Sequence, residues 1–168
     1  SKEEKIMVEW QDNFLEPEAY EELKNIMLGD NIAWYYTPDI TFDNKDTKGN
    51  LFYMTHQFYE DHRPCSPYFD KYITQFLDKL DIKSLIRVKG NLYPGQNVLS
   101  EHSKHFDYDF PNQGAIFYIN DNDGYTIFDD KVKVDSVGNR LVRFDASKLH
   151  ASTDCTNAKA RVNINFNF

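Results

Sequence analysis

The chain has 168 residues, of which 40% are hydrophobic and 15% aromatic, and this composition predicts one folded domain with a sizeable core and excludes a disordered chain. Its formal net charge of −8 disfavours broad binding to a nucleic-acid backbone, although a local basic groove remains compatible with that charge. No apolar run reaches the length of a membrane span, and the charged start, Ser1–Lys5, which we expect to fray, does not resemble a secretory signal. We therefore expect a cytoplasmic protein without membrane contact, in which Cys65 and Cys155 are free thiols and a disulfide bridge is the less favoured alternative.

The first half of the sequence predicts two helices separated by a polar loop. Pro17 suits the first turn of a helix and Gly29 suits its end, and the apolar stripe between them consists of Tyr20, Leu23, Ile26 and Met27. Residues 31–50 are polar, which indicates a loop with one short strand. A second helix is expected to begin with Ser66 as N-cap and Pro67 in its first turn, because apolar residues then recur at helical spacing: Phe69, Tyr72, Ile73, Phe76, Leu77 and Leu80.

From Leu85 onward the pattern changes to short strands divided by turn residues. The expected strands are Ile86–Tyr93, Ala115–Asn120, Thr126–Phe128, Lys131–Asp135, Arg140–Asp145 and Arg161–Phe168. Helices followed by short antiparallel strands predict an α+β fold in a single domain, 1–168. We expect a helical part at about 1–84 and, at about 85–168, a β-sandwich or jelly-roll (double-stranded β-helix) core with helices packed on one sheet.

The last expected strand alternates polar and apolar residues without interruption. One face carries Arg161, Asn163, Asn165 and Asn167, and the other carries Val162, Ile164, Phe166 and Phe168. The simplest interpretation is a polar face in water above an apolar core. The alternative places Arg161 and Asn163 inside a ligand-lined barrel, with the apolar face under the helices.

The most informative short motif is His105-Phe106-Asp107. In an extended strand, residues i and i+2 point to the same face, so the imidazole and the carboxylate can reach one ion. His150 would complete a set of two histidines and one carboxylate with three coordination positions open, as in non-haem Fe(II) sites. Arg161 then offers a planar cation suited to a second carboxylate. His-x-Asp alone is a weak signal, and the order of these residues carries the inference.

The sequence around the motif resembles the 2-oxoglutarate- and Fe(II)-dependent oxygenases, in particular their prolyl-hydroxylase-like branch with its small phage-encoded members. The resemblance covers about residues 86–168 and is carried by Asn91-Leu92-Tyr93-Pro94-Gly95, His105-Phe106-Asp107, Ala115–Asn120, Arg140–Asp145, His150 and Arg161. It implies an oxidoreductase, located in the host cytoplasm if phage-encoded, that uses dioxygen and 2-oxoglutarate to hydroxylate an aliphatic C–H. A prolyl residue, another protein side chain or a small molecule would be the substrate.

The resemblance also implies residue roles. The implied Fe(II) ligands and catalytic residues are His105, Asp107 and His150. The implied cosubstrate-binding residues are Arg161, Tyr118, Tyr93 and Asn163. Arg161 would pair with the distal carboxylate of 2-oxoglutarate, Tyr118 would donate a hydrogen bond to it, and Tyr93 would lie near the metal-chelating end. Ascorbate is a candidate auxiliary reductant, and His102 has no implied role.

Other interpretations stay open at this point. His150 is compatible with a core histidine, Asp107 with a turn residue, and Tyr93 and Tyr118 with ordinary packing. An aromatic cluster in the first half would pack in the core or form a mobile substrate lid: Phe52, Tyr53, Phe58 and Tyr59. The alternative functions are a nucleic-acid oxidative demethylase of the same superfamily, which the acidic charge and Asn167 disfavour, and a non-catalytic jelly-roll binding module.

Overall fold

The computed structural model describes residues 7–41, 50–129 and 131–168. The expected fraying of the first five residues lies outside these ranges, as does part of the polar loop at 31–50. The elements are β1 (Glu9–Gln11), α1 (Pro17–Met27), β2 (Tyr35–Thr37), β3 (Tyr53–Glu60), β4 (Arg63–Pro64), the π-helix η1 (Phe69–Ile73), α2 (Thr74–Lys79), β5 (Arg87–Pro94), β6 (Gln113–Tyr118), β7 (Tyr125–Phe128), β8 (Val132–Asp135), β9 (Arg140–Asp145), β10 (His150–Ser152) and β11 (Ala160–Asn167).

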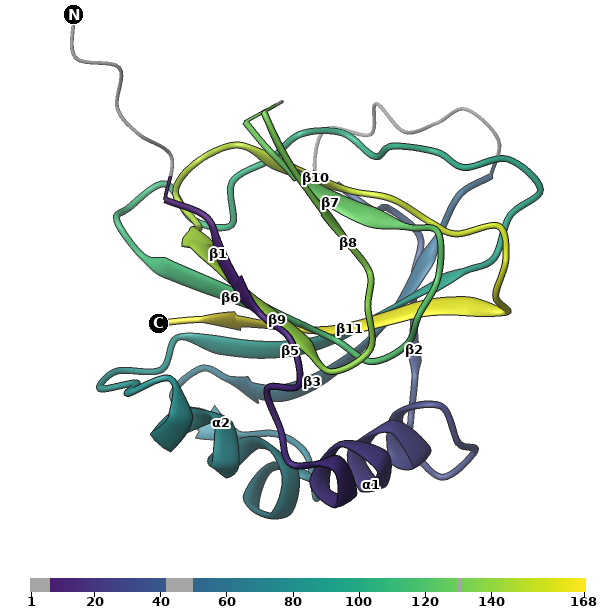
Figure 1. Cartoon of the computed structure of the whole chain (residues 1–168). Coiled ribbons are helices and arrows are strands. Elements are labelled where there is room, and N and C mark those ends of the chain that lie inside the picture. Colours follow the sequence, from purple (N-terminus) through teal and green to yellow (C-terminus); the bar gives the residue numbers. More distant parts are fainter. Residues whose placement is uncertain (1–6, 42–49, 130) are drawn as a thin grey trace, which may run out of the picture.

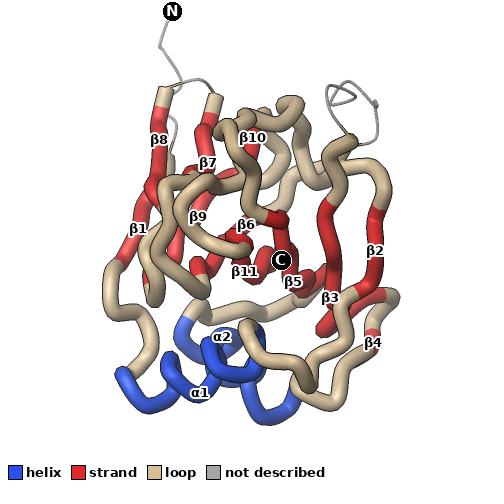
Figure 2. Tube along the Cα trace, turned by 90° about the vertical axis from the view of Figure 1, so that its right-hand side faces the viewer, coloured by secondary structure: helices blue, strands red, loops and turns tan. Residues whose placement is uncertain are grey.

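The strands form two antiparallel sheets, and the helices cover the outer face of the larger one (Figure 1). The larger sheet has the order β1-β9-β6-β11-β5-β3-β2, with β4 paired to β3, and the smaller sheet has the order β10-β7-β8. Figure 2 shows the same layering from the side, with both helices on one side of the strands. The α+β class and the placement of helices on one sheet are therefore confirmed.

The helix layer is held by one apolar core. Helix α1 begins at Pro17, as expected, and buries Leu23 and Met27 completely. These side chains meet the apolar face of the large sheet, to which β11 contributes Val162, Ile164 and Phe166. Gly90 of β5 lies under this contact, where an added Cβ would come within 3.2 Å of the Met27 Cε, so the missing side chain allows the helix and the strand to approach closely.

The second helix differs from the expectation in its first turns. Ser66 does accept the Tyr68 N–H through its Oγ, at 3.1 Å, but residues 69–73 form a π-helix and regular α-helix starts only at Thr74. The Thr74 hydroxyl donates to the carbonyl of Asp70 at 2.6 Å, while the Thr74 N–H donates to the carbonyl of Phe69. A side chain thus takes the acceptor that the i−4 backbone bond would use, which explains the wider turn.

The described residues of the first half also include four strands, so its expected helical character is only partly right. The omission that matters is β3, which pairs with β5 in the interior of the large sheet. A register shift between Gln57 and Tyr59 interrupts its pairing, and its burial does not alternate cleanly along the strand. Because strand prediction relies on a period of two, the irregularity hid this strand.

A second, smaller core lies between the two sheets. It joins Tyr118 of β6 and Val142 of β9 to Phe128 of β7 and Val134 of β8. The six strands expected after residue 85 all occur, within two residues at each end. Cys65 is exposed and Cys155 is buried, and both are free thiols, as expected. In the part of the chain that the structure describes, no helix has the length and apolarity needed to cross a membrane.

Candidate metal centre and anion pocket

The two histidines of the cluster meet because their backbones are paired. His105 and His150 form an isolated antiparallel bridge in which each N–H donates to the other residue's carbonyl, both at 2.9 Å. Residues directly opposite in such a pair project their side chains to the same face. The two imidazole rings accordingly lie 4.6 Å apart between centroids. Residues 105–107 were expected to form an extended strand, but in the structure only this single bridge is formed at His105. Asp107 is held separately, because its N–H donates to the Ala146 carbonyl at 3.0 Å.

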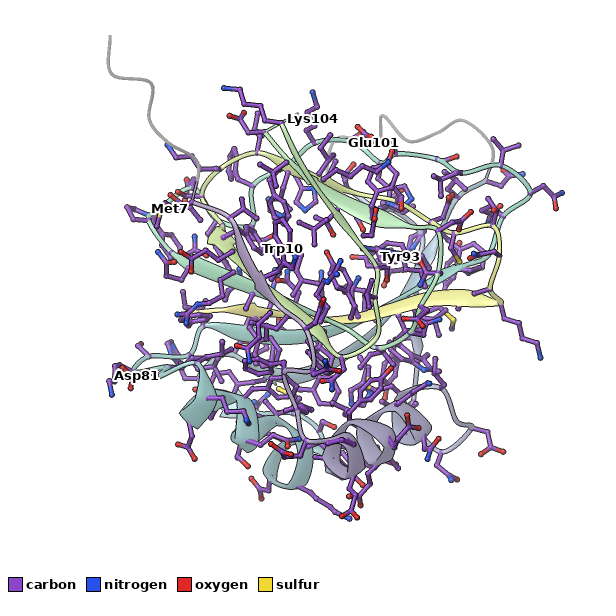
Figure 3. All side chains as sticks on the ribbon, viewed as in Figure 1. Met7, Trp10, Asp81, Tyr93, Glu101 and Lys104 are labelled. Carbon is purple, nitrogen blue, oxygen red and sulfur yellow. The ribbon has the colours of Figure 1, made fainter. Side chains whose placement is uncertain are left out.

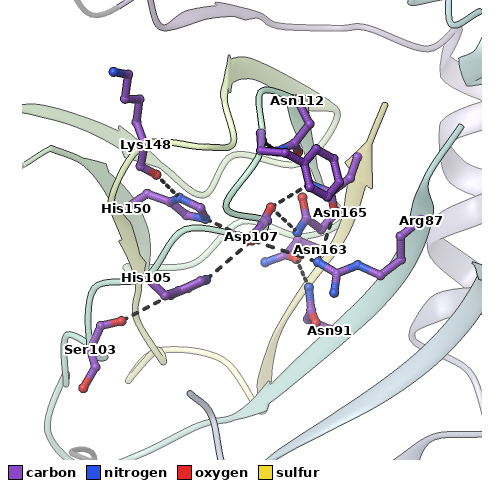
Figure 4. Close-up of polar contacts among 12 residues, drawn as sticks. Arg87, Asn91, Ser103, His105, Asp107, Asn112, Lys148, His150, Asn163 and Asn165 are labelled. Carbon is purple, nitrogen blue, oxygen red and sulfur yellow. Dashed lines mark hydrogen bonds and ion pairs between the residues drawn. The ribbon is translucent and has the colours of Figure 1, made fainter. Parts of the chain in front are cut away.

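Asp107 completes the cluster from the same face. Its Oδ1 lies 3.4 Å from the Nε2 of His150 and 3.7 Å from the Nε2 of His105. Figure 4 shows the two histidines on one side of Asp107, with the asparagines and Arg87 on the other. One ligand atom from each of the three residues lies within 4.8 Å of the other two, which is the spacing that one metal ion can bridge. The structure therefore brings together the three residues that the sequence singled out.

The hydrogen bonds fix which histidine atoms face the ion site. The Nδ1 of His105 is 3.3 Å from the Ser103 carbonyl, and the Nδ1 of His150 is 3.0 Å from the Lys148 carbonyl. A carbonyl accepts only an N–H, so Nδ1 carries the proton in each ring and Nε2 keeps its lone pair for a metal. Burial, followed by the neighbouring His150, lowers the pKa of His105 to about 4, which keeps this ring neutral at physiological pH.

The second oxygen of Asp107 is held by amides from the last strand. Its Oδ2 accepts the Nδ2–H of Asn167 at 2.8 Å and the Nδ2–H of Asn165 at 3.2 Å. Burial alone would raise the pKa of Asp107, but the contact with His150, the Asn167 amide and the Arg87 charge together hold that pKa well below its usual range. The carboxylate is therefore ionised, with one oxygen anchored and the other directed at the histidines.

Arg161 is the largest fully buried side chain in the described part of the chain. Its Nη1 donates to the Ser152 Oγ at 2.6 Å and to the Thr153 carbonyl at 3.2 Å, and its Nη2 donates to the Thr126 Oγ1 at 3.2 Å. Its Nε has no hydrogen-bond partner, and among the described residues no carboxylate forms an ion pair with it. Asp154 is also buried nearby, but its Oδ1 accepts the Ser100 N–H. A buried guanidinium that forms no ion pair with a described carboxylate, and that Asp154 attracts only from a greater distance, is the electrostatic feature of this part of the site.

The two tyrosines implied by the resemblance flank this guanidinium. The carbon of the Arg161 guanidinium lies 5.7 Å from the ring centroid of Tyr93 and 5.5 Å from that of Tyr118. Figure 3 places Tyr93 in the space between the two sheets. Burial raises the pKa of both phenols, so each is a neutral donor at physiological pH. The Tyr118 hydroxyl donates to the Thr126 Oγ1 at 2.8 Å, and this threonine was missed by sequence reasoning.

The polar face of β11 is buried, so its interpretation as a solvent-facing surface is wrong. Arg161, Asn163, Asn165 and Asn167 are each at most 8% exposed. Across from them, in register on β5, lie Tyr93, Asn91, Lys89 and Arg87. These facing side chains of β11 and β5 form a polar ladder. In its middle, the Asn163 Oδ1 accepts a hydrogen bond from the Asn91 Nδ2 at 3.0 Å.

Sequence reasoning gave a role to Tyr93 but missed the other polar residues of β5, although their signal was present. Arg87, Lys89, Asn91 and Tyr93 alternate with Val88, Gly90 and Leu92, the same period of two that drew attention to the last strand. His102, for which no role was implied, is buried with its ring 5.2 Å from that of Tyr93. In the aromatic cluster, Phe58 is fully buried, and Tyr53 stacks on Tyr93 at 5.4 Å, which favours packing over a mobile lid.

Comparison with known proteins shows the fold. No family model matches the sequence, and no curated protein matches it. Among solved structures, the chain is similar to a prolyl hydroxylase from Trichoplax adhaerens in complex with a hypoxia inducible factor peptide fragment, at 16% identity and a TM-score of 0.66, with 96% of this chain and 83% of that chain covered. It is also similar to a prolyl-4-hydroxylase from Pseudomonas putida, at 15% identity and a TM-score of 0.58, with 98% and 93% covered.

A third similar structure is HygX from Streptomyces hygroscopicus with nickel, 2-oxoglutarate and hygromycin B bound. Its identity is 9% and its TM-score 0.64, with 96% of this chain and 82% of that chain covered. The chain thus has the fold of the 2-oxoglutarate- and Fe(II)-dependent oxygenases, including their prolyl hydroxylases, as the sequence resemblance predicted.

Proposed function

We propose that the protein is a non-haem Fe(II)- and 2-oxoglutarate-dependent dioxygenase that hydroxylates an aliphatic C–H, with a prolyl residue or another protein side chain as the substrate. In this proposal the two sheets form a double-stranded β-helix within a single domain spanning 1–168. His105, Asp107 and His150 would hold Fe(II), and Arg161 would bind the distal carboxylate of 2-oxoglutarate. Similar folds that contain bound 2-oxoglutarate with nickel, or a bound peptide fragment, support this assignment.

The observation that carries the proposal is the buried Arg161 guanidinium beside a cluster of metal ligands. Burying an ion without a partner costs several kcal/mol, so a buried cation of this kind indicates an anionic ligand that completes it. Arginine presents five N–H donors in a rigid fork, and its Nε–H remains without a partner here. A carboxylate is the anion that matches this fork.

The donor set of the cluster fits Fe(II). Two imidazole Nε2 atoms and one carboxylate oxygen on one face are the ligands of the non-haem Fe(II) enzymes, and they leave positions open for a cosubstrate and dioxygen. The bound iron would supply the oxidative chemistry, in which 2-oxoglutarate is converted to succinate and carbon dioxide while the substrate is hydroxylated.

The residues of the chain itself position and shield this chemistry. The carbonyls of Ser103 and Lys148 hold the two imidazoles in the tautomer that a metal requires. Asn165 and Asn167 hold the carboxylate of Asp107. Each of these bonds limits the rotation of a ligand, so the cluster is preorganised.

At the other end of the pocket, a threonine organises the donors. The Thr126 Oγ1 accepts hydrogen bonds from both Arg161 and Tyr118, which leaves its own O–H free to donate to the cosubstrate. Tyr118 and Thr126 are each at most 1% exposed, so bulk water does not compete for the carboxylate. We assign Tyr93 and Asn163 to the wall between the two ends of the cosubstrate.

The test is the binding of 2-oxoglutarate to anaerobic, Fe(II)-loaded protein, followed by the visible charge-transfer band and by succinate release. Arg161→Ala should weaken 2-oxoglutarate binding by at least about 100-fold, which corresponds to about 2.7 kcal/mol of a buried charge pair. His105→Ala should abolish the band while leaving the far-UV circular dichroism unchanged, because the metal is catalytic and does not hold the fold.

Two outcomes would reject the proposal. No band in folded, metal-loaded wild-type protein would favour the non-catalytic binding module. An Arg161→Ala variant with unchanged 2-oxoglutarate affinity would remove the role of the guanidinium. Succinate release stimulated by methylated oligonucleotides, but not by proline-containing peptides, would move the substrate to nucleic acid.

A further inference from the structure

We propose that the substrate of this site carries a carboxylate group, and that Lys89 and Arg87 recognise it in the pocket beside the metal ligands. The inference rests on the proposed function and names the class of substrate for the same site. It rests on a cavity beside the cluster, on the cations Lys89 and Arg87 in its wall, and on the register of β5 against β11.

The cavity opens on the side of the cluster away from Arg161. It has a volume of about 370 Å³, and its walls include His105 and Asp107 of the cluster, Lys89 and Arg87 of β5, and Tyr53 of β3. Arg161 and Tyr118 are not among its lining residues. A substrate in this cavity would therefore lie against the metal ligands without competing for the anion pocket that we assign to 2-oxoglutarate.

Lys89 lines this cavity, and Asp107 and Glu60 attract its ammonium group only from beyond ion-pair distance. It lies on the inward face of β5, opposite Asn165 in the register with β11. Among the described residues, no hydrogen bond or ion pair engages its ammonium group, which lies 5.6 Å from the ring centroid of Tyr53. Enclosing a cation in this way costs free energy, and an aromatic ring offsets only part of that cost.

Arg87 lies next to Lys89 on the same face and has spare capacity to donate. Its Nη2 donates to the Asn167 Oδ1 at 3.0 Å and lies 4.0 Å from the Asp107 Oδ1, and its Nε is buried without a partner. The side chain is 17% exposed, so part of it reaches the cavity. The Nη2 group of Arg87 therefore interacts with Asp107 and Asn167, while the N–H groups of Nη1 remain for a ligand.

The charges around the cavity give a positive balance in an acidic protein. The charged residues of its lining, apart from the titratable His105, are Arg87, Lys89, Asp39 and Asp107. Asp107 already contacts the histidines and accepts hydrogen bonds from two amide groups. A divalent metal ion bound to the cluster would carry two positive charges, which is more than the single negative charge of Asp107. Asp39 is exposed, and Glu60, which is not part of the lining, attracts Lys89 only from beyond ion-pair distance, so no further carboxylate of the described residues pairs with the two cations.

The lining favours a carboxylate on a short carbon chain. The charged groups are side chains on a strand, whereas phosphate sites usually use backbone N–H groups at a helix N-terminus or in a glycine-rich loop. Pro38, Ile40, Tyr53 and Phe106 provide an apolar wall for the carbon atoms. The cavity volume is at the small end of the range for ligand pockets, about 300–1,000 Å³. The carboxylate comes either from a free amino acid or from an acidic side chain next to the target residue of a peptide.

The experiment measures binding to Ni(II)-loaded, 2-oxoglutarate-saturated protein by isothermal titration calorimetry, with two matched pairs of probes. One pair is L-proline and L-prolinamide. The other is an acetylated, amidated hexapeptide that contains Pro-Glu and its Pro-Gln twin. At least one carboxylate probe should bind about 10- to 100-fold more tightly than its amide twin, as expected for a partly desolvated charge pair, and the pair that does so identifies the source.

The variants test whether Lys89 causes the discrimination. Lys89→Met should reduce it to within about twofold, while Lys89→Arg should retain it. Lys89→Gln replaces the Met variant if the latter does not fold. Lys133→Met is the matched control, because Lys133 is exposed and lies over Tyr125, another lysine–tyrosine pair, outside the cavity.

Three results would overturn the inference: carboxylate probes that bind no more tightly than their amide twins, no binding of either carboxylate probe, or unchanged discrimination in Lys89→Met. The 2-oxoglutarate affinity of each variant, measured in the same samples, separates the two proposals. If 2-oxoglutarate binds in an Arg161-dependent manner and the discrimination is absent, only the substrate class is wrong. If 2-oxoglutarate does not bind, the proposed function itself fails.

Discussion

Lys89→Met should stabilise the metal-free protein, because the cost of burying the wild-type lysine as a cation exceeds its attraction to Asp107 and Glu60. Burial, and secondarily the charge of Arg87, lowers the pKa of Lys89 from 10.5 to about 8. Each tenfold change in a protonation equilibrium corresponds to about 1.4 kcal/mol, so the full displacement corresponds to about 3.4 kcal/mol. The side chain keeps some contact with the water of the pocket mouth, and we take about half of that value, roughly 1.5–2 kcal/mol.

The sign of the pH dependence follows from the two states. The unfolded chain binds the Lys89 proton below pH 10.5, whereas the folded chain binds it only below about pH 8. The unfolded state therefore holds more protons between these values, and the stability of the wild type rises as the pH increases through this window. The destabilising contribution is fully present below about pH 8 and disappears above about pH 10.5.

The assay is thermal unfolding in the presence of a chelator at about pH 7 and about pH 9.5, which brackets the folded-state pKa. For a chain of this size, 1 kcal/mol changes Tm by about 2–4 °C, so Lys89→Met should unfold roughly 3–8 °C higher than the wild type at the lower pH. The difference should shrink at the higher pH. The control Lys133→Met removes an exposed lysine and should change Tm little at either pH. A Lys89→Met variant with a Tm at or below that of the wild type at pH 7, or with a gain that does not depend on pH, would refute the reasoning.

Two further predictions concern positioning residues. Asn167→Leu removes the shorter of the two hydrogen bonds from amide groups to Asp107 and should weaken metal affinity about 10- to 100-fold in a chelator competition. The control Asn163→Leu, whose amide partner is Asn91, should leave metal affinity unchanged. Equal losses of metal affinity in both variants would contradict the role of Asn167. Gly124→Ala places a Cβ 2.4 Å from the Arg161 Cδ and 2.5 Å from the Asp154 carbonyl oxygen. We therefore expect a loss of stability of about 1–3 kcal/mol and a raised KM for 2-oxoglutarate. An unchanged KM would show that Arg161 is not displaced.

Gly124 shows that a local sequence pattern can predict a residue's conformation without showing which distant side chain it contacts. The sequence Asp121-Asn122-Asp123-Gly124 predicts a turn, and in the structure these residues belong to a bent loop between β6 and β7. The glycine is needed for another reason, because the buried arginine of β11 passes directly beside it. Nothing within the motif itself indicates a side chain almost 40 residues away.

The cluster shows which part of a site can be inferred from order along the chain. His105 and Asp107 are two residues apart, and that spacing alone allows them to share a face. The assignment of His150 and Arg161 depended on their residue types and order along the chain, and on the resemblance to a family, since local pattern does not pair distant residues. In the structure, the backbone bridge between His105 and His150 provides that pairing.

The sequence by itself determined the features that are repeated along a strand or helix: the stripe of α1, the strands after residue 85, and the alternation of β11. Such periods arise from backbone geometry and need no partner. Tertiary structure decided that the polar face of β11 is buried, because burial depends on what lies opposite. It also decided that Lys89 and Arg87 enter the cavity beside the cluster, since the register of β5 on β11 aligns two alternating patterns that are distant in sequence.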